Sequence, residues 1–203
     1  TELRKYFNGK SFMKNILLIV MLIFISIFLP AQDNSSKNKC KENCKGGKGN
    51  CIQSIDTVKY DLSTKEKDGL VYMRLEEKLA RDVYLTLGKT HTQKMFVNIP
   101  ESEQRHMDAV KVLLDKYEIP DPVTDNEIGS FINTDFKKLF DDLVAKGQIS
   151  FNDAMLVGKE IEEMDIKDLT ERIEQTDNPD IKSVYENLKR GSENHLKAFT
   201  KHL

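Results

Sequence analysis

Glutamate and histidine residues occur in this sequence at positions where a helical repeat would place apolar side chains. Glu103 follows Ile99 and precedes Met107 at intervals of four residues, and His106 shares its face with Val110. Apolar residues at intervals of three and four mark the buried face of a helix. Glu103 and His106 are therefore predicted to point inward. Taken alone, such a Glu-x-x-His pair is weak evidence for a metal site, because in one helix it is more often a surface pair.

Three further segments repeat this arrangement of a polar residue on an apolar face. Each polar residue has apolar neighbours three or four residues away, as Glu76 has in Tyr72 and Leu79. The other residues predicted to point inward by this spacing are Glu162, Asp165 and His195.

The acidic neighbours of these residues are assigned to other faces. Glu77 is predicted at the edge of its helix, and Glu160 and Glu163 are predicted on a solvated face. The rotation of each helix decides this assignment. A shift of a third of a turn would bring Glu77 inward in place of Glu76, or Glu163 in place of Glu162.

The predicted interior set combines four carboxylates with two imidazoles. No lysine lies on the predicted inward faces, and Arg172, two turns from Asp165, is the nearest inward-leaning cation. Burying four carboxylates without counter-charges would cost many kcal/mol or force them to take up protons. Two divalent cations would balance their charge, and the mixed nitrogen and oxygen ligands suit iron, with manganese as the second choice. The alternative is a polar core satisfied by water.

Composition favours long helices as the elements that position these residues. The 203 residues include only 10 Gly, 5 Pro and no Trp, which disfavours a turn-rich sandwich or barrel. Hydrophobic residues make up 39% and charged residues 32%, enough for one domain with a core. The net charge of -2 argues against nonspecific nucleic-acid binding.

Periodicity and capping signals predict four long helices and one short one. The long helices are expected over 64–89, from a first turn containing Pro100 to about Tyr117, from after Ser150 to about Gln175, and from after Asn178 to the C-terminus. A short helix over 134–146, stopped by Gly147, lies in the long connection. On the first helix Lys78, Arg81 and Asp82 are assigned to the outer side or its flanks. The expected fold is an all-α four-helix bundle with one long crossover, the connectivity of ferritin-like folds.

The chain before this domain is predicted to serve targeting. Residues 1–31 contain an uncharged apolar run, Ile16 to Leu29, and read as a signal peptide or a membrane anchor. Residues 32–58 form a Lys- and Gly-rich linker, and 59–203 the helical domain. The linker holds all three cysteines, Cys40, Cys44 and Cys51, which favour one disulfide plus a free thiol, or an intermolecular bridge, over a metal or redox site. Export to the periplasm or the cell exterior is expected, with membrane attachment only through an uncleaved signal.

Four segments carry a resemblance to a known family: EEKLARDVY, NIPESEQRHMDAVKVLLDKYEI, VGKEIEEMDIKDL and ENLKRGSENHLKAF. Over residues 70–203 the chain resembles domain of unknown function 2202, a family of ferritin-like proteins. The wider superfamily implies one Glu on helix one, Glu-x-x-His on helix two, one Glu on helix three and Glu-x-x-His on helix four. The residues that match this layout are Glu76, Glu103, His106, Glu162 and His195. Ser192 departs from it, standing where the second Glu-x-x-His would have its glutamate, and Asp165 is a candidate to supply the missing carboxylate.

These observations lead to an expected function and two alternatives. The first expectation is an exported oxidoreductase that acts on oxygen or peroxide. In it Glu103 and Glu162 bridge two metal ions, Glu76 and Asp165 are terminal oxygen ligands, and the histidines are terminal nitrogen ligands. Without a rubredoxin-like CxxC pair, it would need an external electron donor. The alternatives are a noncatalytic metal-binding or storage module and a metal-free structural bundle, and a homodimer is compatible with all three.

Overall fold

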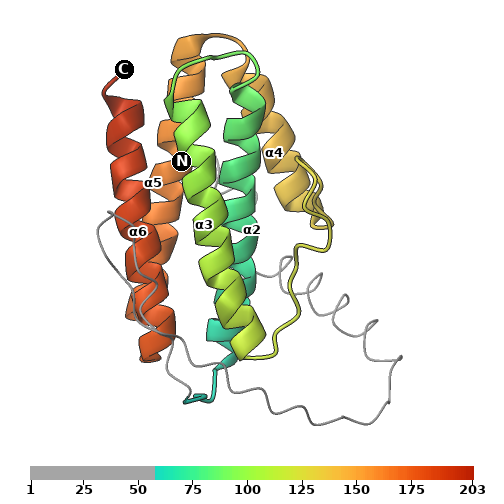
Figure 1. Cartoon of the computed structure of the whole chain (residues 1–203), viewed down its shortest axis with the longest axis vertical. Helices are drawn as coiled ribbons and strands as arrows, with labels where there is room; N and C mark the ends of the chain where they lie inside the picture. The colour runs from blue at the N-terminus through green and yellow to red at the C-terminus, as the bar shows by residue number, and fades with distance from the viewer. Residues whose placement is uncertain (1–57) are drawn as a thin grey trace, which may run out of the picture. The chain divides into compact units, whose positions relative to one another are not determined.

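The computed structural model describes residues 58–203, and these residues belong to one compact unit. Within this range the chain forms five α-helices and no strands (Figure 1). They are α2 (Thr64–Leu87), α3 (Met95–Lys116), α4 (Thr134–Gly147), α5 (Phe151–Glu174) and α6 (Pro179–Thr200). The predicted signal segment 1–31 and the linker with its three cysteines lie outside the described residues, apart from Val58. Among the described helices, none is long and apolar enough to cross a membrane.

The four long helices pack side by side in two pairs. α2 lies along α3 and α5 lies along α6, while contacts between α3 and α6 and between α2 and α5 join the pairs. The turn between α2 and α3 and the turn between α5 and α6 are at opposite ends (Figure 1). The connection from α3 to α5 runs back along the length of the helices and contains α4, which packs on α2 and α5.

Side-chain caps explain where most of the helices begin. Ser63 and Glu66 form a capping box at the start of α2, and the Ser150 hydroxyl accepts a hydrogen bond from the Asp153 amide at the start of α5. Asn178 caps α6, in which Pro179 is the first residue. The predicted starts of these three helices are therefore confirmed.

The start of α3 differs from the prediction. The helix begins at Met95, so Pro100 lies inside it rather than in its first turn. Proline removes one backbone donor, which leaves a single helical hydrogen bond unmade. The additional turn buries Phe96 and Ile99, which are 3% and 6% exposed, and this burial offsets the lost bond. Pro100 was therefore a misleading boundary signal.

The end of α4 also has a different cause from the one expected. Gly147 is the last residue of the helix rather than a stop beyond it. A Cβ atom at this position would lie 2.7 Å from Cδ1 of Leu87. Glycine is needed here because α4 ends in close contact with α2.

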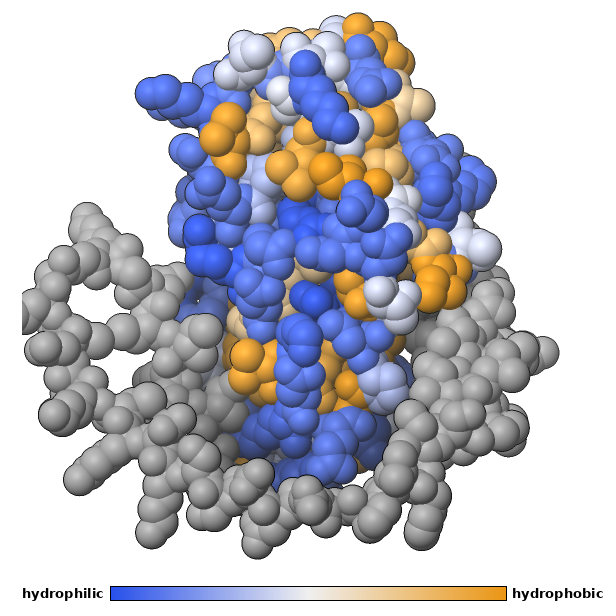
Figure 2. Space-filling view, turned by 45° about the vertical axis from the view of Figure 1, so that its right-hand side comes forward, coloured by the Kyte–Doolittle hydropathy of each residue, from blue (hydrophilic) through white to orange (hydrophobic). Residues whose placement is uncertain are grey.

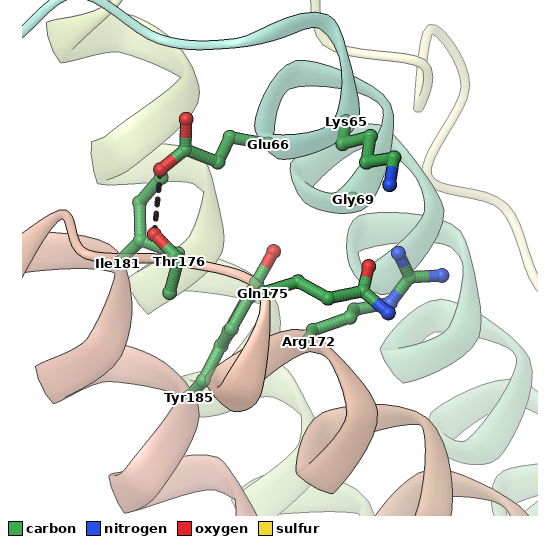
Figure 3. Close-up of a pocket in the computed structure, with 8 residues that line it drawn as sticks. All are labelled: Lys65, Glu66, Gly69, Arg172, Gln175, Thr176, Ile181 and Tyr185. Carbon is green, nitrogen blue, oxygen red and sulfur yellow. Dashed lines mark hydrogen bonds between the residues drawn. The ribbon is translucent and has the colours of Figure 1, made fainter.

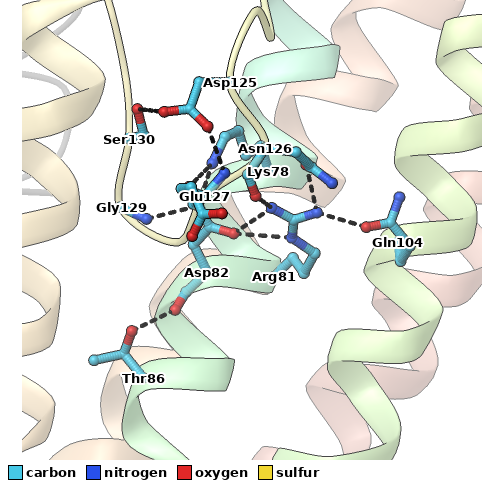
Figure 4. A network of polar contacts seen from close by, with 10 residues as sticks. All are labelled: Lys78, Arg81, Asp82, Thr86, Gln104, Asp125, Asn126, Glu127, Gly129 and Ser130. Atoms are coloured by element: carbon cyan, nitrogen blue, oxygen red, sulfur yellow. Dashed lines mark hydrogen bonds and ion pairs between the residues drawn. The ribbon is translucent and has the colours of Figure 1, made fainter.

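The placement of Lys78, Arg81 and Asp82 on an outer side is wrong, because all three are buried, at 1%, 5% and 0% exposure. The connection between α3 and α4 crosses this face of α2 and covers it (Figure 4). The Asp82 carboxylate pairs with Lys78 and Arg81 and accepts a hydrogen bond from the Gly129 amide at 3.0 Å. Lys78 also donates to the Glu127 carbonyl at 2.8 Å. These charges therefore hold the crossover segment against α2.

The outer surface of this unit is mixed in character. Figure 2 shows hydrophilic side chains over much of one face, with separate apolar patches between them. Val97 and Ile128 are among the exposed apolar residues, at 61% and 43% exposure, and they line a shallow groove between α3 and the crossover segment.

Candidate metal centre

The six residues that were predicted to point inward all lie in the interior. Their helices are α2, α3, α5 and α6, so each long helix contributes at least one of them. Glu76 and Glu162 are 1% exposed, Glu103 is 2% exposed, and Asp165 and His195 are buried. The His106 side chain is 12% exposed.

One group of possible ligands joins α3, α5 and α6. Glu103, Glu162 and His195 each offer a ligand atom, and these atoms lie within 4.8 Å of one another. Nδ1 of His195 is 2.8 Å from Oε1 of Glu103 and 3.6 Å from Oε1 of Glu162. Two carboxylates and one imidazole thus converge on one point.

A second group lies beside the first and shares Glu103 with it. Here the ligand atoms of Glu77, Glu103 and His106 lie within 4.8 Å of one another. Nδ1 of His106 is 2.9 Å from Oε2 of Glu103 and 3.2 Å from Oε2 of Glu77. The two oxygens of Glu103 therefore face different histidines, whose rings stack at 5.7 Å between centroids.

Glu77 is the residue of this centre that the sequence prediction did not choose. It was expected at the edge of its helix, but it is 2% exposed and contacts His106. α2 is covered on nearly every side, so its neighbouring glutamates can both be buried. The sequence pointed to Glu77 only through the alternative rotation of this helix, in which Glu77 replaces Glu76 on the inward face.

Glu76 and Asp165 lie outside both groups. Both oxygens of Glu76 are buried without a hydrogen-bond partner, and so is Oδ1 of Asp165. Oδ2 of Asp165 is hydrogen-bonded to the Ser192 hydroxyl, which is also 3.1 Å from the Leu188 carbonyl. Asp165 therefore reaches Ser192, the position at which the resemblance described above led us to expect a glutamate.

Electrostatics divide the buried groups into charged and neutral ones when no cation is present. Burial and the neighbouring Glu103 charge raise the pKa of Glu162 to about 7. Burial also raises the pKa of Glu77 to about 7, although His106 opposes the shift. Burial alone would lower the pKa of His195, but the Glu103 carboxylate outweighs it and raises the pKa to about 10. The two imidazolium groups, by contrast, overcome burial and lower the pKa of Glu103. The positive charges of the protonated histidines thus balance the negative charge of Glu103, and bound metal ions could balance it instead.

The hydrogen bonding of the site fits bound cations. Oε1 of Glu103 and Nδ1 of His195 form a close ion pair that is not aligned as a hydrogen bond, and both atoms are buried without a hydrogen-bond partner. Oε1 of Glu77 is likewise buried and unpartnered. Buried polar atoms without partners are rare in folded proteins and call for an explanation such as an ion. Carboxylate and imidazole ligands suit iron and manganese.

Two further residues shape the centre without belonging to either group. The Tyr84 hydroxyl donates a hydrogen bond to Oε1 of Glu162 at 2.7 Å and thereby orients that carboxylate. A Cβ atom on Gly191 would lie 2.5 Å from Nε2 of His106. Glycine at this position of α6 therefore makes room for the imidazole from α3.

Comparisons with known proteins identify relatives over most of the chain. The sequence model of an uncharacterized protein domain, DUF2202, matches residues 66–203. The uncharacterized protein MJ0754 of Methanocaldococcus jannaschii is 57% identical over 145 residues, which are 71% of this chain and 78% of that protein. The crystal structure of hypothetical protein MJ0754 from Methanococcus jannaschii DSM 2661 is similar, with a TM-score of 0.71 and 55% identity over 74% of this chain and 85% of that chain. These names assign no activity, so function has to be argued from the site.

Proposed function

This chain belongs to the DUF2202 family of uncharacterized protein domains, and we propose from its own site that it is a dinuclear metal protein with a ferritin-like four-helix bundle. Its ions are iron in the first place, with manganese as the alternative. Its activity is that of an oxidoreductase which acts on oxygen or peroxide. The predicted signal segment adds the proposal that the protein is exported.

The single observation that carries this proposal is the shared position of Glu103. One oxygen of Glu103 faces His195 and the other faces His106, at 2.8 Å and 2.9 Å. A carboxylate that belongs to two ligand groups is suited to bridge two cations. In this proposal Glu77 and His106 complete one metal position, and Glu162 and His195 complete the other. Asp165 and Glu76 lie outside both ligand groups and hold neither ion in this proposal.

The arrangement of the helices supports the ferritin-like assignment. Four long helices each contribute at least one inward carboxylate or histidine, and a single long crossover joins α3 to α5. Di-metal carboxylate proteins of this class build their sites from the inward faces of such helices. The Glu-x-x-His pair at Glu103 and His106 matches that class, while Ser192 replaces the glutamate of the second pair.

Two ferrous ions at this centre would supply the two electrons that break the O–O bond of a peroxide, which takes up two protons and leaves as two waters. The residues of the chain prepare the site for this chemistry. Tyr84 fixes the Glu162 carboxylate, and Gly191 leaves room for His106. The apolar side chains around the carboxylates exclude bulk water and strengthen the electrostatic interactions inside. An external electron donor completes the cycle.

Metal content tests the proposal directly. The full chain, purified without chelator, should hold about two iron or manganese ions per molecule. A content below about half an equivalent would rule out both a catalytic and a storage role. Consumption of peroxide or oxygen by the ferrous protein then separates an oxidoreductase from a storage protein, which binds iron without such turnover.

A matched pair of variants on α5 controls this experiment. Glu162→Gln removes a buried candidate ligand carboxylate from the centre, whereas Glu163→Gln removes an exposed carboxylate that pairs with Lys159. We expect loss of bound metal and of turnover in the first variant and wild-type behaviour in the second. Equal metal content in the two variants would contradict the assignment of Glu162.

A further inference from the structure

Tyr84 brings a phenol hydroxyl to one of the two ligand groups. Its side chain is fully buried on α2, and its hydroxyl oxygen lies 2.7 Å from Oε1 of Glu162. The same oxygen of Glu162 is 3.6 Å from Nδ1 of His195. Two oxygens bound at neighbouring positions of one octahedral ion lie about 3 Å apart. The spacing of the Tyr84 and Glu162 oxygens is therefore compatible with their binding the same ion.

Packing fixes the phenol ring in this position. The Phe199 ring of α6 lies against it, with 5.1 Å between the ring centroids. A Cβ atom on Gly158 of α5 would lie 2.4 Å from Cδ1 and from Cε1 of Phe199, so glycine is needed for that ring to approach α5 this closely. The Tyr84 hydroxyl oxygen is also 3.5 Å from the Gly158 carbonyl. Contacts from two neighbouring helices thus hold the hydroxyl beside Glu162.

The charges of the two ligand groups favour a further anion once bound iron is oxidised. Glu77, Glu103 and Glu162 supply three negative charges. Two ferrous ions bring four positive charges, and their oxidation to the ferric state brings two more. An excess of charge in a dry interior is costly unless groups of opposite charge compensate it. A phenolate at Tyr84 would supply one further negative charge.

We propose that Tyr84 is a ligand of the ferric form of the centre, where it binds the ion held by Glu162 and His195. Phenolate oxygen serves as an iron ligand in other proteins. In the binding step the O–H bond of Tyr84 breaks, a bond forms between its oxygen and the iron, and the proton is released to solvent. Before oxidation the hydroxyl keeps its proton and its hydrogen bond to Glu162. The ferric ion arises from oxidation by oxygen or peroxide, so this inference rests on the proposed function and adds a ligand to it.

A second buried tyrosine provides a matched control. Tyr185 of α6 is 2% exposed and lines a small pocket with Gly69 and Arg172 (Figure 3). None of the residues that line this pocket belongs to either ligand group. Tyr84→Phe and Tyr185→Phe each remove one buried hydroxyl and keep the aromatic ring. The two variants differ in whether the lost hydroxyl contacts a candidate ligand.

Visible spectroscopy of the iron-loaded full-length protein tests this proposal. A phenolate bound to ferric iron absorbs visible light by charge transfer from oxygen to iron, and resonance Raman scattering excited in that band shows the vibrations of the phenolate. We expect both signals in the oxidised wild type and in Tyr185→Phe, and their loss in Tyr84→Phe. Elemental analysis should find about two iron ions per chain in all three proteins, because the carboxylate and imidazole ligands remain.

Crystals of the ferric protein give a second readout that needs no variant. The Tyr84 oxygen should lie about 2 Å from an iron ion, the usual length of a metal–oxygen bond in proteins. Wild-type protein that binds ferric iron but shows no phenolate signal, or a signal that survives in Tyr84→Phe, would overturn the inference and leave the proposed function standing. Wild-type protein that binds no iron would refute the proposed function and the inference together.

Discussion

Glu77 and Glu76 are adjacent on α2, and both are buried, but they have different neighbours. Glu77 contacts His106, while Glu76 lies outside both ligand groups and has no hydrogen-bond partner. The sequence spacing places Glu76 on the apolar face of its helix, so Glu76 was predicted to be the inward glutamate of α2. Periodicity identifies one inward face, whereas a helix covered on nearly every side has several.

This difference yields a prediction for two isosteric variants. Glu77→Gln removes a ligand charge and should lower the metal content from about two ions per chain to about one. Glu76→Gln should keep about two ions, because its side chain joins neither ligand group. Elemental analysis measures both, with circular dichroism to verify folding. Greater metal loss in Glu76→Gln than in Glu77→Gln would restore the sequence-based assignment.

Most of the remaining site was predictable because it combines chemically distinctive residues with helical spacing. Glu103, His106, Glu162 and His195 were identified in this way, and the structure brings them together in two groups. Gly191 carried no such signal. Its role depends on how closely α3 and α6 approach each other, which is a property of packing rather than of local sequence.

At the scale of elements, the starts of helices with polar caps were predictable and the path of the crossover segment was not. Ser63, Ser150 and Asn178 satisfy the free amides of their helices, a local interaction that sequence reveals. The burial of Lys78, Arg81 and Asp82 depends on a segment more than forty residues away in sequence. Charged residues on a helix are usually solvated, so only the tertiary structure corrects that expectation.

The crossover segment gives the second prediction, which concerns stability. Asp82→Asn leaves the buried Lys78 and Arg81 without their carboxylate and should lower the free energy of unfolding by about 3–5 kcal/mol. Asp141→Asn breaks an exposed pair with Lys137 and should cost less than about 1 kcal/mol. Urea unfolding monitored by circular dichroism measures both values. Equal destabilisation by the two substitutions would show that the buried network does not hold the crossover.

At the scale of the whole molecule, the protonation of the candidate ligands is coupled to folding. Without metal, the folded protein holds protons on Glu77 and Glu162, whose pKa values are about 7, and on His195, whose pKa is about 10. The unfolded chain releases these protons at lower pH, near the ordinary values of 4.5 for Glu and 6.5 for His. The stabilisation from these groups is therefore present below those values and is lost as the pH rises through the folded-state values.

The third prediction follows from this loss of stability with rising pH. The melting temperature of the metal-free protein should fall between about pH 6 and about pH 9, as measured by calorimetry with a chelator present. Added Mn²⁺ should reverse the trend, because metal binds the deprotonated ligands and binds them better at high pH. His195→Gln should weaken the pH dependence above neutrality. A metal-free protein whose melting temperature rises over this range would contradict the assigned protonation states.

The central claim is that two metal ions share Glu103, and anomalous X-ray scattering from crystals of the iron-loaded protein tests it most directly. The account predicts two iron peaks, one among Glu77, Glu103 and His106 and the other among Glu103, Glu162 and His195. No peak, a single peak, or peaks that do not adjoin Glu103 would contradict it.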